Sequence, residues 1–264
     1  MFTTVVIACL VLGSIAGFLA GLLGIGGGLI IVPVLLYLLP LLDISVELAM
    51  PMALATSLAT IIITSSSAAL AHHKNNNIPW PLAKSMALVV GVGAISGAFI
   101  AEQLTSKALT NFFAGAVIVL ASYMLLSIKF SRTGSLPSKL VLNIIALITG
   151  IVASLMGIAG GAILVPVLSY LGMALRQAIG LATVCGVAVA IFGSASFIYT
   201  GLQQSVLPPY SLGYIYLPAL FAIVIASSCF AKLGVKMASQ LPVVTLKRIF
   251  ALFLLIVAIK MLVS

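Results

Sequence analysis

Charged residues are scarce in this chain of 264 residues. Three are acidic and twelve are Lys or Arg, so charges occupy 6% of the sequence and the formal net charge is +9. A soluble domain carries charges at about a quarter of its positions. The shortage excludes a soluble globular enzyme, and the 63% of hydrophobic residues point to a lipid bilayer as the solvent.

Other features are also missing. The basic residues stand singly between apolar runs, so they do not form the basic patch of a nucleic-acid-binding protein. Cys9, Cys185 and Cys229 lie isolated in apolar stretches, without the spacing of a metal site or a redox dithiol. No Ser-His-Asp or H-E-x-x-H arrangement occurs either. We therefore expect no enzyme activity, no cofactor, no metal site and no nucleic-acid partner.

The three acids, Asp43, Glu47 and Glu102, all fall in predicted loops or at the ends of apolar segments. Proton- and cation-coupled transporters commonly place a carboxylate within the membrane. Its absence disfavours a cation or metal carrier, although this class is kept as an alternative. It favours a carrier for a small anion that binds through backbone dipoles.

Long apolar runs predict an all-α polytopic membrane protein with about eight to ten membrane segments, because a span needs about 20 apolar residues. The first run lacks the basic region and cleavage site of a signal peptide. Two shorter runs, 29–42 and 162–172, follow glycine-rich stretches and are predicted as half-helices or re-entrant arms. The full-length candidates are 3–23, 47–71, 80–101, 107–128, 139–156, 175–198, 211–231 and 243–263.

An internal duplication divides the chain. Segment 17–38 matches segment 150–171 at 14 of 22 positions, including a shared glycine-glycine-x4-proline pattern. Further along, segment 54–56 matches 181–183, Ser67 matches Ser194, and Gly97 matches Gly234. We therefore predict a first membrane repeat over 1–128, a cytoplasmic linker over 129–138 and a second membrane repeat over 139–264.

The direction of the two repeats depends on whether each half crosses the membrane an even or an odd number of times. Cytoplasmic loops are enriched in Lys and Arg, so the charges can decide. An inverted arrangement puts ten of the twelve basic residues on one side, whereas a parallel arrangement divides them almost evenly. We predict inverted repeats, with the linker in the cytoplasm and both termini outside. The ten are Lys74, Lys84, Lys129, Arg132, Lys139, Arg176, Lys232, Lys236, Lys247 and Arg248.

Each glycine-rich stretch predicts a broken helical hairpin with a candidate substrate site. The short helix after each break begins with N–H groups that have no partner within the helix, and its dipole makes that end partly positive. Two such ends meeting near the membrane midplane would bind an anion without Lys or Arg. Close helix packing is the alternative role for these glycines. The candidate residues are Gly26, Gly27, Gly28, Gly160 and Gly161.

Hydroxyl groups are the second set of candidate ligands. Ser and Thr in a membrane helix usually bond the backbone one turn earlier, so a structural role stays open. The residues proposed for substrate binding are Thr56, Ser57, Ser67, Thr183 and Ser194.

Several polar or aromatic residues have positions typical of the ends of spans. His72 and His73 fit an interfacial loop, with proton coupling or pH sensing as the alternative. Tyr210, Tyr214 and Tyr216 fit interface anchors.

The duplicated motifs, G-L-L-G-I-G-G-G-L-I-I-V-P at 21–33 and S-L-M-G-I-A-G-G-A-I-L-V-P at 154–166, resemble those of the TauE/SafE family. The A-T-S motif at 55–57 and A-T-V at 182–184 add to the resemblance, which covers essentially the whole chain. It implies a carrier in the bacterial inner membrane for sulfur-containing anions such as sulfite, sulfoacetate or organosulfonates. Ala159 stands where the first motif has Gly26, so the two half-sites are expected to differ.

The sequence therefore predicts a transporter in which a small oxyanion binds between the two breaks and access alternates as one repeat rocks against the other. A non-transporting membrane assembly factor is the competing class. Whether the chain forms a homodimer is left open.

Overall fold

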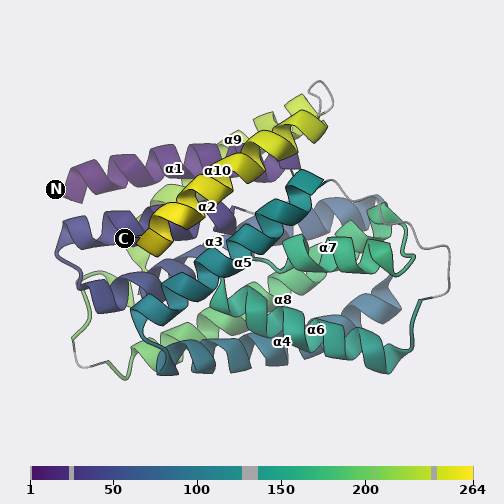
Figure 1. The fold of residues 1–264 in the computed structure, drawn as a ribbon, viewed down its shortest axis with the longest axis horizontal. Coiled ribbons are helices and arrows are strands. Elements are labelled where there is room, and N and C mark those ends of the chain that lie inside the picture. Colours follow the sequence, from purple (N-terminus) through teal and green to yellow (C-terminus); the bar gives the residue numbers. More distant parts are fainter. Residues whose placement is uncertain (1, 24–26, 127–135, 205, 239–242, 264) are drawn as a thin grey trace.

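A computed structural model of the chain describes residues 2–23, 27–126, 136–204, 206–238 and 243–263, and over these it is a bundle of helices (Figure 1). The all-α polytopic class that the sequence predicts is confirmed. The elements are α1 (Phe2–Leu23), α2 (Gly28–Leu38), the 3-10 turn η1 (Leu39–Leu42), α3 (Val46–Lys74), α4 (Trp80–Gln103), α5 (Ser106–Leu126), α6 (Lys139–Leu155), α7 (Gly161–Tyr170), α8 (Leu175–Gly201), β1 (Ser211–Leu212), β2 (Ile215–Tyr216), α9 (Leu217–Ala238) and α10 (Val243–Val263).

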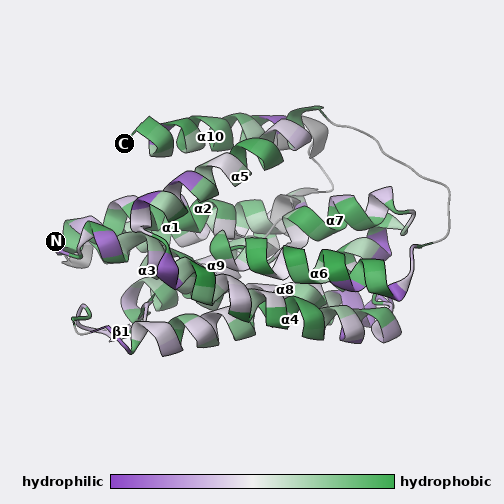
Figure 2. Cartoon of the chain, turned by 60° about the horizontal axis from the view of Figure 1, so that its bottom comes forward, coloured by the Kyte–Doolittle hydropathy of each residue, from purple (hydrophilic) through white to green (hydrophobic). Residues whose placement is uncertain are grey.

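Hydrophobic residues occupy most of the length of these helices, and hydrophilic residues gather toward their ends (Figure 2). Within the described ranges, α3, α4, α5 and α8 are long and apolar enough to cross a bilayer. The short helices α2 and α7 have 11 and 10 residues, so at 1.5 Å per residue each covers only about half of the hydrocarbon core. The chain is a multi-pass membrane protein.

One predicted span begins differently in the structure. The run 211–231 starts not as a helix but as an antiparallel hairpin, in which Ser211 pairs with Tyr216 and Leu212 with Ile215. Gly213 lies in the left-handed region at φ 54°, which turns the chain between the strands. Helix α9 therefore begins only at Leu217.

The two halves of the chain are interleaved rather than side by side. Helix α1 packs along α9, and α4 packs along α6. Gly13 lies against Ile223 and Gly17 against Ser227, so α1 and α9 run in the same direction. The pair α4 and α6 is parallel in the same way. Each pair thus joins the first helix of one half to the fourth helix of the other.

Helices α3 and α8 cross the centre in opposite directions. Leu58 of α3 lies beside Gly193 of α8, and Ser65 lies beside Gly186, so residue numbers rise along one helix as they fall along the other. Helices α3 and α8 occupy corresponding places in the duplication. Helix α1 begins at the left of the bundle and α6 at the right (Figure 1). This order is what an inverted duplication requires; the orientation of the halves across a membrane and the boundaries of the repeats stay predictions.

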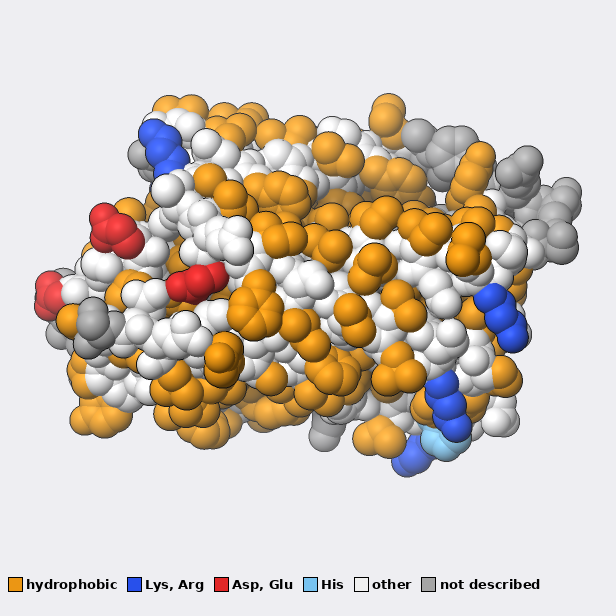
Figure 3. Space-filling model, turned by 90° about the horizontal axis from the view of Figure 1, so that it is seen from below, with side chains coloured by type: hydrophobic (Ala, Val, Ile, Leu, Met, Phe, Trp, Pro, Cys, Tyr) orange, Lys and Arg blue, Asp and Glu red, His pale blue; other side chains and the backbone are white. Residues whose placement is uncertain are grey.

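The charges separate between the two ends of the bundle. On the face shown in Figure 3, the acidic side chains lie toward one end together with some Lys or Arg side chains, and the other visible Lys and Arg side chains lie at the opposite end. The Ser106 hydroxyl donates to the Val46 carbonyl (2.9 Å), which brings Glu47 and Lys107 to the same end. At the opposite end, the Ser85 hydroxyl donates to the Asn143 side chain (3.4 Å), beside Lys84 and Lys139.

Glycines allow the paired helices to approach through their backbones, which gives a first prediction. A Cβ on Gly93 would collide with the Leu147 carbonyl of α6 and lie 3.1 Å from the Gly150 Cα, whereas a Cβ on Gly115 would meet nothing within 4 Å. We expect Gly93→Ala to lower the free energy of unfolding by about 1–3 kcal/mol through overpacking. Gly115→Ala should be neutral or stabilise by up to about 1 kcal/mol through its better helix propensity. Thermal unfolding in detergent measures both, and equal midpoints would contradict the proposed packing.

Candidate substrate site

The two glycine breaks meet inside the bundle. Helix α2 begins at Gly28 and α7 at Gly161. A Cβ on Gly28 would lie 2.5 Å from the Gly157 carbonyl oxygen and 3.1 Å from the Ile158 Cα. No side chain fits in that space, so the breaks contact one another through bare backbone. Close packing, which the sequence left open as the alternative to anion binding, is therefore one role of these glycines.

The breaks differ in backbone conformation. Gly157 and Gly160 have φ values of 62° and 72°, in the left-handed region that favours glycine. Gly27, the N-cap of α2, has an ordinary helical φ of −74°. The predicted site residue Gly26 lies outside the described residues. A Cβ on Gly161 would meet nothing within 4 Å, so this glycine borders open space.

Both short helices start with N–H groups that have no acceptor within the helix. In α2, the N–H groups of Ile30 and Ile31 donate to the Gly27 carbonyl, and in α7 those of Ile163 and Leu164 donate to the Gly160 carbonyl. The N–H groups ahead of these donors have no acceptor within the helix, and the helix dipole adds partial positive charge there.

The A-T-S motif of α3 lies against elements of the second half. The Ser57 hydroxyl donates to the Gly157 carbonyl at 2.7 Å. The Thr56 hydroxyl oxygen accepts a hydrogen bond from the Tyr216 N–H at 3.0 Å. Both side chains are fully buried. The structure thus places these two predicted residues beside the second break and beneath the hairpin.

The remaining predicted hydroxyls have different surroundings. Thr183 donates to Gly180 of its own helix at 2.7 Å, which is the structural role left open for such residues. Ser194 is buried with no hydrogen-bond partner among the described residues. Ser67 is exposed on α3, about three turns beyond Thr56, so it is not brought to the breaks.

Buried polar side chains in the described part of the chain all belong to Ser or Thr, and no Lys, Arg, Asp or Glu is among them. No described group of His, Cys, Asp and Glu could hold a metal ion. Any ligand in this interior would therefore be bound by hydroxyls and backbone dipoles.

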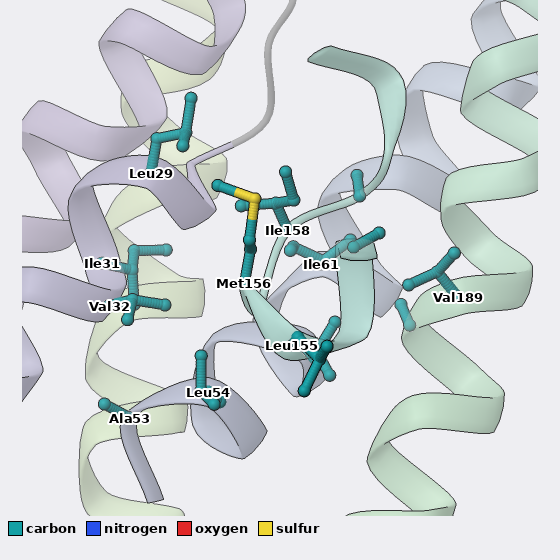
Figure 4. Close-up of a cluster of buried hydrophobic side chains, with 14 of the residues drawn as sticks. Leu29, Ile31, Val32, Ala53, Leu54, Ile61, Leu155, Met156, Ile158 and Val189 are labelled. Atoms are coloured by element: carbon teal, nitrogen blue, oxygen red, sulfur yellow. The ribbon is translucent and has the colours of Figure 1, made fainter. Parts of the chain in front are cut away.

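Apolar side chains close the space around the second break. Figure 4 shows Met156 and Ile158 of the α6–α7 turn near Leu29 and Val32 of α2 and Leu54 of α3. Met156 and Ile158 are buried.

A small cavity lies beside the first break. Measured to the centre of a water-sized sphere, its volume is about 10 Å³. Sequence reasoning missed its three hydroxyls, Thr60, Thr64 and Ser227, because it selected hydroxyls of the matched A-T-S and A-T-V motifs and of the Ser67–Ser194 match. At these positions one repeat has a hydroxyl and the other an apolar side chain, and a search for such differences could have identified the three residues. The lining residues are Ala16, Gly17, Ala20, Gly27, Ile31, Thr60, Thr64 and Ser227.

The hairpin before α9 covers the end of the bundle that carries the acids. Tyr214 donates to the Glu102 carboxylate at 3.2 Å, and the Gln204 amide donates to the same oxygen at 2.8 Å. Burial and then the neighbouring Glu102 raise the pKa of the Tyr214 phenol, which keeps it a donor. Tyr214 and Tyr216 are buried, so their predicted role as interface anchors is wrong, while Tyr210 is exposed.

The loop between α3 and α4 lies at the opposite end. The Trp80 N–H donates to His73 Nδ1 (3.3 Å), and Asn77 contacts His72 Nδ1 at 3.3 Å. A Cβ on Gly180, near the start of α8, would lie 2.5 Å from the Asn77 carbonyl oxygen. The two histidines therefore lie in the last turn of α3, where they contact the loop that covers this end, away from the breaks.

An apolar helical bundle in which a broken helix from each half meets the other is the architecture of a membrane transporter. The model of the family described as sulfite exporter TauE/SafE matches residues 9–261, and the chain belongs to this family. No solved structure matches the chain.

Similar proteins that carry a name are also described as membrane transporters. The chain is 44% identical over 263 residues to a probable membrane transporter protein of Haemophilus influenzae, with 99% of each chain covered. A probable membrane transporter protein of Methanocaldococcus jannaschii is 27% identical over 229 residues, covering 86% of this chain and 84% of that one. Another, of Bacillus subtilis, is 25% identical over 246 residues, covering 88% and 89%.

The bond between Ser57 and the second break gives a second prediction. Ser57→Ala leaves the buried Gly157 carbonyl without this donor, so we expect a loss of about 1–3 kcal/mol in the free energy of unfolding. Ser196→Ala is the matched control, because Ser196 is also buried in the bundle but donates to Phe192 of its own helix at 2.9 Å. Its removal should change stability little. Thermal unfolding in detergent compares the two, and an equal loss in both would show that the bond between the halves is unimportant.

Proposed function

We propose that the chain is a secondary transporter for a small anion, most simply a sulfur oxyanion such as sulfite, sulfoacetate or another organosulfonate. One observation carries the proposal: the start of α2 at Gly28 contacts the turn that leads into α7 at Gly157, in an interior whose described buried polar side chains are all Ser or Thr. Helix starts and hydroxyl groups present donors and partial positive charge to an oxyanion.

The chemistry of this interior supports an anion over a cation. A cation or metal carrier requires acceptors, usually carboxylates, and Asp43, Glu47 and Glu102 lie toward one end of the bundle rather than inside it. The description of the family as sulfite exporters supports the choice of a sulfur oxyanion. Transport requires no acid–base pair, and we propose no enzyme activity.

The loops that cover the two ends support alternating access. The hairpin before α9 bonds to Thr56 near the start of α3, and the α3–α4 loop packs on Gly180 near the start of α8. These loops occupy corresponding places in the two repeats. We propose that one loop leaves its helix while the other stays in contact, so that the breaks open to one side at a time. Each loop would act as the gate for its end.

The charge separation supports a bacterial inner-membrane orientation with the linker in the cytoplasm. The end that carries Lys74, Lys84, Lys139 and Arg176 would be cytoplasmic by the positive-inside rule. Both termini would then lie outside.

Epitope tags at each terminus test this orientation. We expect antibodies or a membrane-impermeant label to reach both tags in spheroplasts with an intact inner membrane. A tag on the linker should be protected under the same conditions and become accessible after lysis. Protection of the C-terminal tag with exposure of the N-terminal tag would contradict the inverted arrangement.

Bulky side chains at the breaks test the site. Gly27→Leu and Gly160→Leu should abolish flux of sulfite or organosulfonates in proteoliposomes, because the new side chains push the breaks away from Ala16 and Thr149 and, at Gly160, force an unfavourable φ. Gly115→Leu is the control, since a Cβ there meets nothing within 4 Å. Correct insertion is checked by the elution volume of each purified variant in detergent. Unchanged flux in both break variants, or a wild-type protein that moves none of these anions, overturns the proposal.

A further inference from the structure

The two breaks are not equivalent in the side chains that surround them. The cavity beside Gly27 is lined by hydroxyls from two helices, Thr60 and Thr64 of α3 and Ser227 of α9. Thr60 and Ser227 are buried. The three groups therefore converge from both halves of the chain on the first break.

The duplication supplies an internal comparison for this cavity. Gly160 corresponds to Gly27, and Thr149 corresponds to Ala16. The structure keeps this correspondence: a Cβ on Gly27 would lie 3.4 Å from the Ala16 Cβ, and a Cβ on Gly160 would lie 3.2 Å from the Thr149 Cγ2. The surroundings of the two breaks can therefore be compared position by position.

Helix α9 and its counterpart α4 can be compared in the same way, through the glycines that pack on them. Gly17 of α1 packs on Ser227 of α9, and Gly150 of α6 packs on Val90 of α4. Val90 thus occupies the place of Ser227 in the second half.

The hydroxyls that line the cavity beside Gly27 have no counterparts at the second break. With the register in which Thr56 matches Thr183, Val187 stands for Thr60 and Ile191 stands for Thr64. Thr149 is the one hydroxyl that the second half adds at a lining position, but it donates to Ile145 of its own helix at 2.7 Å and its methyl group faces Gly160. The second break therefore lacks counterparts of the three cavity hydroxyls, and the α3 hydroxyl that reaches it, Ser57, donates to its Gly157 carbonyl.

The hydroxyls beside Gly27 can turn toward a ligand. Thr64 donates to its own helix at 3.4 Å and Ser227 at 3.2 Å, which are long for O–H···O bonds. Thr60 donates a shorter bond of 2.7 Å to the Ser57 carbonyl, and it must give up this bond to donate to an anion. When the Thr64 and Ser227 hydroxyls rotate toward an anion, they break only these long, weak hydrogen bonds.

We propose that the transported anion binds beside the first break alone, with Thr60, Thr64 and Ser227 as its side-chain ligands, and that the second break positions the first. The proposal rests on the function proposed above and assigns its selectivity to one half-site. A sulfite ion or a sulfonate group offers three oxygens, which matches three convergent hydroxyls. The present cavity holds about one water-sized sphere, so α1 and α9 must move away from α3 when the anion enters.

Direct binding measurements test this assignment without relying on flux. Detergent-solubilised protein is titrated with sulfite and with 2-hydroxyethanesulfonate, with chloride as a reference, and Kd is obtained by calorimetry. Thr60→Val, Thr64→Val and Ser227→Ala should each weaken binding of both sulfur anions about tenfold, the usual effect of one hydrogen bond to a charged group. Thr149→Val, at the corresponding second break, should leave Kd unchanged.

The outcomes separate this inference from the proposed function. If wild type binds sulfite and none of the three variants weakens the binding, the assignment to the first break is wrong while anion transport stands. Weakening by Thr149→Val to the same extent would also overturn it, because both breaks would then bind. Absence of binding in wild type overturns both proposals. If Thr60→Val fails to fold, Thr64→Val at its half-buried position and Thr64→Ser, which should retain affinity, decide the question.

Discussion

The contact between Gly28 and the Gly157 carbonyl is the constraint on which the rest of the structure depends. A side chain at Gly28 would collide with that carbonyl, so the two broken hairpins can meet only as bare backbone. Ser57 then holds the second break through its bond to the same carbonyl. With both hairpins fixed at the centre, α1 packs along α9 and α4 along α6, and each half completes the other.

Separation of charge from the interior is the second organising feature. The charged groups gather toward the two ends of the bundle, whereas the described buried polar groups are Ser and Thr. In a medium of low dielectric constant, an uncompensated ion would be strongly disfavoured, while hydroxyls can be satisfied by the backbone of their own helix. Such an interior is stable when empty and can still offer donors to an anion, provided that the hydroxyls turn away from the helix.

Duplication supplies two copies of each structural part, but the copies have different chemistry. Glycine and proline occur at corresponding positions of both short helices because these residues determine backbone shape. The hydroxyls of Thr60 and Ser227 give way to Val187 and Val90 in the other half. The loops that cover the ends differ as well, since one is a hairpin bonded to Glu102 and the other a short turn beside two histidines. The short helices are thus repeated, whereas the backbone at their N-caps and the hydroxyls nearby differ between the halves.

The sequence by itself determined the class of protein, the helices and the two breaks, because helix length and glycine position are local properties of the chain. It could not determine which residues face inward, since both faces of a membrane helix are apolar and hydropathy does not distinguish lipid from protein. Only the tertiary structure decided that Ser67 is exposed, that Tyr214 and Tyr216 are buried, and that Ser227 lies beside Thr60. These contacts join helices far apart in sequence, and their positions depend on how closely glycine lets the backbones approach.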